Sequence, residues 1–273
     1  MSIHSSPSYV AAVVLTLNEH QHIAACLETL GWADRRIVFD SFSNDGTVEI
    51  ARACGAEVIQ HPFENYAQQR NAALACAREA GAAWVFFVDA DERCTPPLAE
   101  EVQHIVRQEG AGHDVWAVPR HNYLFGRLTL GAGWYPDYQA RLFRVGKADF
   151  EPSRAVHEVA RFAGEMGRLQ NVLLHYNYET VAQFHAKQRR YAALEAGILF
   201  KQGVRPKVRN FFLQPAREFR RRFFALRGYV DGLHGLRLSV LMAYYTWFMY
   251  RQLAQMWQTQ GDASQRGSLS TSL

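Results

Sequence analysis

Strand-like and helix-like patterns alternate through residues 1–110, and this alternation is the strongest constraint on the fold. Short runs with strand character occur at 10–15, 37–39, 57–59 and 84–88. The segments between them carry apolar residues at the spacing of an amphipathic helix. This alternation predicts a parallel sheet covered by helices on both faces, and therefore a protein of the α/β class.

Polar residues follow the first, second and fourth of these strand-like runs. They are Asn18 and Glu19, then Asp40, and then the segment Asp89-Ala90-Asp91-Glu92. Ligands of open α/β sheets bind beyond the carboxyl ends of the parallel strands. We therefore expect these side chains to share one rim of the sheet.

Asp89 and Asp91 are the strongest candidates for chemistry. Two carboxylates separated by one residue in a tight turn can present oxygens to one Mg²⁺ or Mn²⁺ ion. An acidic turn that precedes a helix is the competing interpretation, but the shared rim favours a metal. The chain has no phosphate-binding glycine loop, so a nucleotide bound here would need a metal in its place.

Three further residues have weaker local support. Asp40 can accept hydrogen bonds from a ribose or a base, or Asp40 and Asp45 can cap the helix expected at Thr47, and both alternatives stay open. His157 can ligate a metal or pair with a diphosphate, although a lone histidine is more often structural. Asp137 can act as a general base if it faces the same cleft, and an aspartate in a proline turn is the alternative.

Charge is distributed unevenly along the chain, whose formal net charge is +4. Segment 187–227 contains 12 Lys and Arg but only two acidic residues, a net charge of +10, so the remainder carries −6. Such a segment attracts nucleic acid, anionic lipid or a phosphorylated substrate.

An uncharged, aromatic-rich run at 238–250 follows the basic segment, between Arg237 and Arg251. It is shorter than the roughly 20 residues that cross a bilayer. Its aromatic residues suit a membrane interface, and a helix that packs in a core is the alternative. A membrane-embedded acceptor would favour the interface.

The remaining composition excludes several other classes of protein. At 48% hydrophobic and 21% charged residues, the chain is neither disordered nor collagen-like. Four cysteines without a Cys-x-x-Cys pair indicate reduced thiols in a cytosolic protein. No basic residue precedes the first apolar run, so we expect no secretory signal.

The ordered motifs resemble glycosyltransferase family 2, whose members are inverting enzymes with a GT-A fold. The matching segments are Val14–Glu19, Asp40–Thr47, Phe87–Glu92 and Trp134–Arg144. Two further segments, Val156–Glu158 and His175-Tyr176, are similar to the subgroup that includes lipopolysaccharide core β-glucosyltransferases acting on heptose.

The resemblance implies roles for individual residues. The residues expected to bind the nucleotide sugar are Asn18, Glu19, Asp40 and Asp89, and the expected metal ligands are Asp89, Asp91 and His157. Asp137 takes the place of the usual catalytic base. Pro136 replaces the Glu of the family's Glu-Asp pair, so Glu158 is a reserve candidate for the base.

The resemblance also implies an architecture. We expect a Rossmann-like GT-A catalytic domain at 1–180, with a nucleotide-binding half at 1–110 and an acceptor half at 111–180. A basic amphipathic helical extension would follow at 181–257, and a disordered tail at 258–273.

The expected enzyme is a metal-dependent hexosyltransferase that moves a hexose, with glucose the expected sugar, from a UDP-sugar to a lipopolysaccharide-core or other lipid-linked saccharide. It would act in the cytoplasm, peripherally on the anionic inner membrane, and would not bind nucleic acid. The alternatives are a non-enzymatic adaptor that binds membrane or nucleic acid, and a nucleotidyltransferase.

Overall fold

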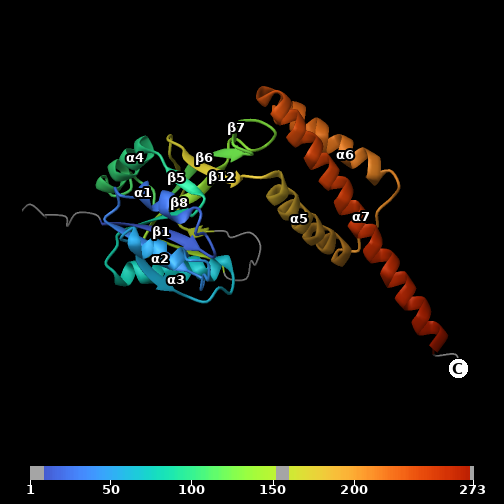
Figure 1. Cartoon of the computed structure of the whole chain (residues 1–273), viewed down its shortest axis with the longest axis horizontal. Coiled ribbons are helices and arrows are strands. Elements are labelled where there is room, and N and C mark those ends of the chain that lie inside the picture. Colours follow the sequence, from blue (N-terminus) through green and yellow to red (C-terminus); the bar gives the residue numbers. More distant parts are fainter. Residues whose placement is uncertain (1–8, 152–159, 271–273) are drawn as a thin grey trace, which may run out of the picture. The chain divides into compact units, whose positions relative to one another are not determined.

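Two compact units make up the chain (Figure 1). The computed structural model describes residues 9–151 and 160–270, with side chains as far as 260. Residues 1–121 and 136–176 form one unit, here called the sheet unit. Residues 122–135 and 177–273 form the other, here called the helical unit.

Parallel strands form one end of the large sheet in the sheet unit, with β3 at its edge. Their order is β3-β2-β1-β4, and each neighbouring pair is parallel. The strands are β1 (Val10–Thr16), β2 (Arg35–Asp40), β3 (Glu57–Gln60) and β4 (Trp84–Asp89). The helices that alternate with and follow them are α1 (Ile23–Glu28), α2 (Thr47–Ala53), α3 (Tyr66–Glu79) and α4 (Pro96–Arg107). The α/β class predicted from the sequence is confirmed.

The sheet becomes mixed beyond β4, in the order β8-β6-β12-β5, with β7 and β11 also paired to β6. β8 is antiparallel to β4 and β6, and β5 is antiparallel to β12. A separate antiparallel pair is formed by β9 and β10. These strands are β5 (Glu92–Cys94), β6 (Val115–Leu124), β7 (Arg127–Thr129), β8 (Tyr138–Arg144), β9 (Ala148–Phe150), β10 (Ala160–Phe162), β11 (Gly167–Arg168) and β12 (Leu173–Tyr178).

The apolar character of the central strands follows from two cores, one on each face of the sheet. Successive side chains of a strand point to opposite faces. In β4, Phe86 and Val88 therefore pack into the core that includes α1 and α4, whereas Val85 and Phe87 pack into the core that includes α3. Because both faces are covered, the strand is apolar at consecutive positions.

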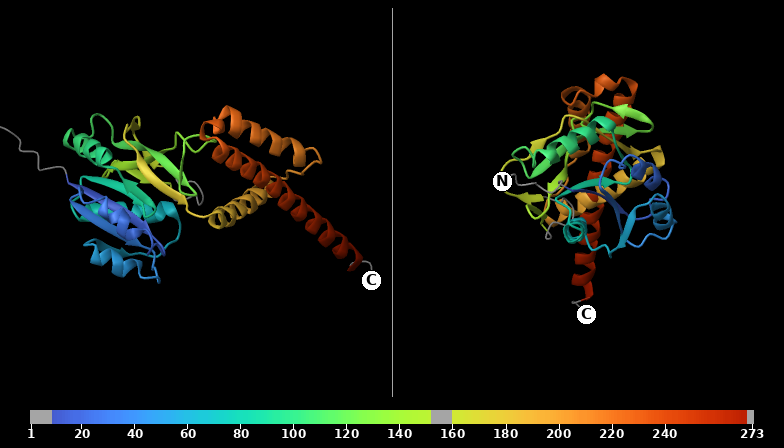
Figure 2. Two further views of the ribbon diagram at one scale, coloured as in Figure 1. Left: turned by 45° about the horizontal axis from the view of Figure 1, so that its top comes forward. Right: turned by 90° about the vertical axis from the view of Figure 1, so that its left-hand side faces the viewer.

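As far as residue 270, the described part of the helical unit contains three longer helices and two short ones. They are α5 (Val181–Lys201), α6 (Asn210–Arg220), the π-helical turn η1 (Arg221–Ala225), the 3₁₀ turn η2 (Gly228–Asp231) and α7 (Leu233–Ser270). Figures 1 and 2 show α6 lying along the first half of α7. No helix in the described ranges has the length and hydropathy needed to cross a membrane.

The uncharged run at 238–250 packs within the helical unit. Leu238 and Tyr245 are buried with Phe184 of α5, and Met249 is buried with Ala192. The expectation that this run forms a membrane interface therefore does not hold for these side chains. Core packing, the alternative interpretation, applies to these buried side chains, whereas Val240 and Tyr244 of the same run are 52% and 44% exposed, so a membrane interface stays a prediction for the rest of the run.

Residues 122–135 lie with the helices, so the predicted division at residue 180 differs from the observed one. Asp231 accepts hydrogen bonds from the backbone N–H groups of Leu130 and Gly131, at 3.0 and 2.7 Å. A Cβ atom on Gly131 would lie 2.3 Å from the carbonyl oxygen of Arg227, so glycine is required for this approach. Contacts between residues this far apart in the chain leave no mark in local sequence patterns.

The C-terminal segment also differs from its prediction. The structure continues α7 to Ser270, where we expected a disordered tail from 258. Residues 258–270 contain no proline, and extending an existing helix avoids the cost of nucleating a new one.

Burial separates the four cysteines into two pairs, which predicts their reactivity. Cys26 and Cys94 are 0% and 4% exposed, and Cys54 and Cys76 are half-buried. Burial raises the pKa of the Cys94 thiol to about 12, so little thiolate exists at pH 8. Burial, with Glu79 and Glu57 nearby, also raises the pKa of the Cys76 thiol. We expect Cys54 and, more slowly, Cys76 to react with Ellman's reagent in the native protein, and the other pair only after unfolding. Rapid reaction of all four thiols without denaturant would contradict the described packing.

Candidate active site

The carboxyl ends of β1, β2 and β4 meet at one edge of the sheet unit. In the strand register, Thr16 lies opposite Asp40, and Leu15 lies opposite Asp89. The structure therefore brings Asp40 and Asp89 to the two sides of β1, with Asn18 just beyond its end. This is the shared rim expected from the sequence.

The loop that carries Asn18 is joined to the loop after β2. The backbone N–H of Asn18 donates to Ser43 Oγ at 2.8 Å, and Asn18 Oδ1 accepts from the backbone N–H of Asn44 at 3.0 Å. Asn18 has a φ of 58°, a left-handed conformation that asparagine adopts more readily than most residues. The backbone N–H of Glu19 donates to Thr47 Oγ1 at 2.8 Å. Asn18 and Glu19 thus sit beside the start of α2.

Asp40 is fully buried and shapes this loop. Its carboxylate accepts from Thr16 Oγ1 at 2.9 Å, from the backbone N–H of Ser43 at 2.9 Å and from Gln60 Nε2 at 3.3 Å. The cap at Thr47 comes instead from Asp45, which accepts from the Thr47 backbone N–H at 3.1 Å. Of the two functions considered for Asp40, helix capping is therefore taken by Asp45, and contact with a nucleotide stays a prediction.

Asp89 and the buried Glu92 share the guanidinium group of Arg141. Arg141 donates to both oxygens of Asp89, and its Nη2 lies 2.6 Å from Glu92 Oε1. Glu92 Oε2 also accepts from the backbone N–H of Asp89 at 2.9 Å, which fixes the turn after β4. Burial would raise the pKa of Asp89, but Arg141 and Arg70 outweigh it and hold that pKa well below its ordinary value.

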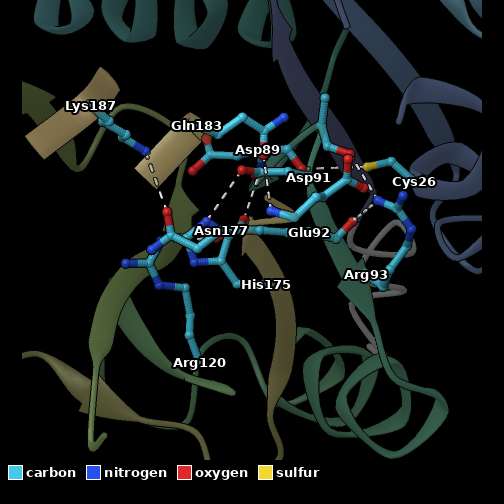
Figure 3. Close-up of polar contacts among 12 residues, drawn as sticks. Cys26, Asp89, Asp91, Glu92, Arg93, Arg120, His175, Asn177, Gln183 and Lys187 are labelled. Atoms are coloured by element: carbon cyan, nitrogen blue, oxygen red, sulfur yellow. Dashed lines mark hydrogen bonds and ion pairs between the residues drawn. The ribbon is translucent and has the colours of Figure 1, made fainter. Parts of the chain in front are cut away.

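Asp91 points to a different partner. Its Oδ2 lies 3.3 Å from Nε2 of His175, which stands in β12 opposite Glu92 of β5 (Figure 3). The Asp91 side chain is 28% exposed. The backbone N–H of Tyr176 donates to the Asp91 carbonyl at 2.9 Å, so the turn is also held through its main chain. The two aspartates of the motif therefore have separate protein partners.

Asp137 lies in the same network of charges through Arg120. Asp137 Oδ2 accepts from Nε and Nη2 of Arg120 at 2.9 and 2.7 Å, and its Oδ1 accepts from Gln139 Nε2 at 2.7 Å. Arg120 Nη1 lies 3.2 Å from Glu92 Oε1. One arginine of β6 therefore connects the expected base, just before β8, with the buried carboxylate beside Asp89.

Not every expected site residue can be placed. His157 and Glu158 lie outside the described residues. Within the described ranges, no group of three or more His, Cys, Asp and Glu side chains has the arrangement of a metal site. Because His157 lies outside those ranges, the expected three-ligand set of Asp89, Asp91 and His157 stays a prediction.

The sequence analysis assigned no site role to five side chains of this network, although it placed Glu92 on the shared rim and His175 in a matching segment. They are Glu92, Arg120, Arg141 and His175, together with Arg70, whose Nη2 lies 3.8 Å from Asp89 Oδ1. One signal was present, because the turn carries three carboxylates within four residues and buried carboxylates need cationic partners. No spacing in the sequence identifies which arginines supply the charge.

Comparisons with known proteins match most of the chain, and a family model matches more than half of it. The family model described as glycosyl transferase family 2 matches residues 11–164. The lipopolysaccharide core biosynthesis glycosyltransferase LpsC of Rhizobium meliloti is 27% identical over 254 residues, which cover 86% of this chain and 90% of that protein. An uncharacterized glycosyltransferase of Rickettsia typhi is 26% identical over 90% of this chain and 87% of its own. Among solved structures, Staphylococcus aureus TarS 1–349 aligns with 89% of this chain and 91% of its own, at 16% identity and a TM-score of 0.46.

Proposed function

The chain belongs to glycosyltransferase family 2, and from this premise we propose that it transfers a hexose from a UDP-sugar to a lipopolysaccharide-core or other lipid-linked saccharide, with inversion at the anomeric carbon. It is a glycosyltransferase with an α/β fold of the GT-A kind, and it resembles enzymes of lipopolysaccharide core biosynthesis. The observation that carries the finer proposal is that Arg120 connects Asp137 with the Asp89–Glu92 turn. A candidate base and a candidate donor site thereby lie in one network.

We propose glucose as the hexose and the cytoplasmic face of the inner membrane as the place of transfer. The motifs Val156–Glu158 and His175-Tyr176 support the choice of sugar through their similarity to β-glucosyltransferases. LpsC, as named, works in lipopolysaccharide core biosynthesis, which supports a lipid-linked acceptor. The net charge of +10 over 187–227 supports peripheral attachment to anionic lipid.

The residues present fit a divalent cation at Asp91. Carboxylate and imidazole are both ligands of Mn²⁺ and related ions, and Asp91 and His175 place one of each side by side. Asp89, by contrast, is held on both oxygens by Arg141. Asp91 and His175 would therefore hold Mg²⁺ or Mn²⁺, leaving other positions for diphosphate and water. Such an ion, when bound, offsets negative charge on the leaving diphosphate.

Asp137 is proposed as the base that takes the proton of the acceptor hydroxyl. Arg120 and Gln139 fix its carboxylate, and its side chain is 23% exposed, so an acceptor can reach it. The acceptor oxygen bonds to the anomeric carbon as the bond from that carbon to the UDP oxygen breaks on the opposite face. The proton passes to Asp137, and the electron pair leaves with UDP. One displacement converts an α-linked donor into a β-glycoside.

Family membership favours this reading over both alternatives. A nucleotidyltransferase would release pyrophosphate from a nucleoside triphosphate, and an adaptor would require no base. Neither alternative explains why Asp137 is fixed by two donors beside the Asp89–Glu92 turn.

A panel of nucleotide sugars, assayed for nucleotide release with a soluble heptose-containing acceptor, tests the proposal. We expect UDP release with UDP-glucose, a β-linked product by NMR, and a requirement for Mn²⁺ or Mg²⁺. Asp91→Asn should raise the metal concentration for half-maximal activity by about 10–100-fold, since it weakens one of two protein ligands. Asp149→Asn, at an exposed position in β9, is the matched control. Unchanged metal dependence in Asp91→Asn would exclude the metal assignment.

A further inference from the structure

One side of α6 and η1 presents aromatic, aliphatic and arginine side chains to solvent. Two rows with four-residue spacing run along it, which places them on adjacent lines of one helical face. The residues of this face, here called the outer face, are Phe212, Ala216, Arg220 and Phe224 in one row and Leu213, Arg217 and Arg221 in the other, all of them exposed.

The apolar members of the outer face are unusually exposed. Phe212 is 70% exposed, Leu213 is 56% exposed and Phe224 is 58% exposed. Val208, in the turn just before α6, is 78% exposed. The inward sides of α6 and η1 pack on the rest of the helical unit, so these four side chains add nothing to its core. Apolar side chains gathered on one helical face indicate a surface that binds a partner.

The charges of the outer face are of one sign. Glu218, the acidic residue of α6, is half-buried and accepts from Arg221 Nε at 2.9 Å and from Arg222 Nε at 2.6 Å. No ion pair involves Arg217 or Arg220 within the described ranges. These two arginines, with Arg221 and Phe224, line a depression of about 650 Å³ in the helical unit, where Glu218 is the acidic lining residue and is paired with Arg221 and Arg222.

Arginines beside large apolar side chains match the chemistry of a bilayer of anionic phospholipid. Such a surface offers phosphate oxygens above and acyl chains below, so an amphipathic helix lying in the interface satisfies both kinds of side chain. Nucleic acid offers phosphates and, where bases are exposed, stacking partners for aromatic rings, but it has no apolar layer for the aliphatic Leu213 and Val208. An acidic protein would need a matching apolar groove as well.

We propose that the outer face of α6–η1 docks on an anionic bilayer. Phe212, Leu213 and Phe224 enter the boundary between headgroups and acyl chains, and Arg217 and Arg220 bind lipid phosphates. This inference rests on the proposed function only for the idea that the acceptor lies in a membrane. It also moves the contact from the run at 238–250, where Leu238, Tyr245 and Met249 are buried, to the more exposed helix beside it.

Vesicle sedimentation of the full-length protein tests the proposal. We expect binding to vesicles of equal parts phosphatidylcholine and phosphatidylglycerol, weaker binding at high salt, and little binding to phosphatidylcholine alone. Arg217→Gln with Arg220→Gln should lower the partition coefficient by roughly 10-fold or more, because each basic residue near an anionic surface contributes about fivefold. Phe212→Ser with Leu213→Ser should also lower it and make the remaining binding more sensitive to salt.

A matched control removes one aromatic and one arginine from the sheet unit. Phe63 is 45% exposed and Arg107 is exposed, so Phe63→Ser with Arg107→Gln should bind like the original protein. All four substituted positions of the outer face are exposed, and circular dichroism checks that each variant folds. Binding by both outer-face variants equal to that of the original protein would overturn the proposal. Failure of the original protein to bind the mixed vesicles would also overturn the proposal, and so would binding to duplex DNA instead of to the vesicles.

Sugar transfer measured on a soluble acceptor separates this proposal from the proposed function. Vesicle binding without any transfer would leave the docking surface in place and reject the enzyme assignment. Sugar transfer without vesicle binding would support the enzyme assignment and reject the docking surface. The outer-face variants should keep full turnover on the soluble acceptor, because none of their residues belongs to the network of charges that joins Asp89, Glu92 and Asp137 through Arg120 and Arg141.

Discussion

Replacing Asp137 by Asn lowers kcat for sugar transfer by about 10²–10⁴-fold, the usual contribution of a general base. The amide keeps the shape of the carboxyl group and still accepts from Arg120 or Gln139, so we expect the fold and the KM for the donor to change little. Arg120 also retains Glu92 as a partner at 3.2 Å. Steady-state kinetics with saturating metal, together with a thermal unfolding curve, measure both expectations.

Two further variants make the Asp137 result specific. Asp149→Asn removes an exposed carboxylate that pairs with Arg161, and activity should persist. Glu158→Gln tests the reserve candidate for the base. If Glu158→Gln lost activity while Asp137→Asn kept it, the base would be Glu158, and the Asp137–Arg120 pair would have a structural role.

Replacing Arg141 by Met destabilises the protein by about 3 kcal/mol, because it leaves buried carboxylates with less compensation. Glu92 is fully buried, and Arg141 itself is 3% exposed. Arg120 and Arg70 remain near the two carboxylates, which places the expected loss at the lower end of the range for a broken buried pair. Thermal unfolding should show a Tm lower by roughly 10 °C.

Arg144→Met, in the same strand, is the control for Arg141. Its ion pair with Asp114 spans 3.6 Å, and the two side chains are 38% and 30% exposed. Exposed pairs contribute less than about 1 kcal/mol, so the Tm should fall by only a few degrees. Equal falls in Tm for Arg141→Met and Arg144→Met would show that the buried ion pairs of the Asp89–Glu92 turn do not contribute the expected stability.

The parallel part of the fold could be predicted because its signal is local. Each central strand is apolar at consecutive positions, and each strand end is followed by polar residues such as Asp40 and Asp89. The mixed part of the sheet was less predictable. β5, of three residues, is held by pairing with β12, about 80 residues later in the chain, and no local pattern marks such a strand.

Only the carboxylates of the candidate site could be predicted from the sequence. Asp89, Asp91 and Asp137 follow or precede strands in recognisable contexts, and the structure places all three at one edge of the sheet unit. Arg120 and Arg141 lie within strands, where a charged residue normally indicates an exposed position. Their burial depends on their ion pairs with Glu92, for which the sequence indicates only a place in an acidic turn. Only the structure, in which the strands are paired, shows that Arg120 and Arg141 are the partners of these carboxylates.

The partners of residues 122–135 are made late during synthesis. Thr129 Oγ1 pairs with His234 Nε2, 105 residues later, and Arg222 Nη1 donates to the carbonyl of Ala132, 90 residues later. At the usual pace of translation these partners leave the ribosome about 5–20 s after the segment itself. Tyr178 and Phe184 emerge earlier and can cover part of Leu124, Phe125 and Trp134, but the cluster stays incomplete until α7 has been made, so some of its apolar surface is exposed on the nascent chain during that interval.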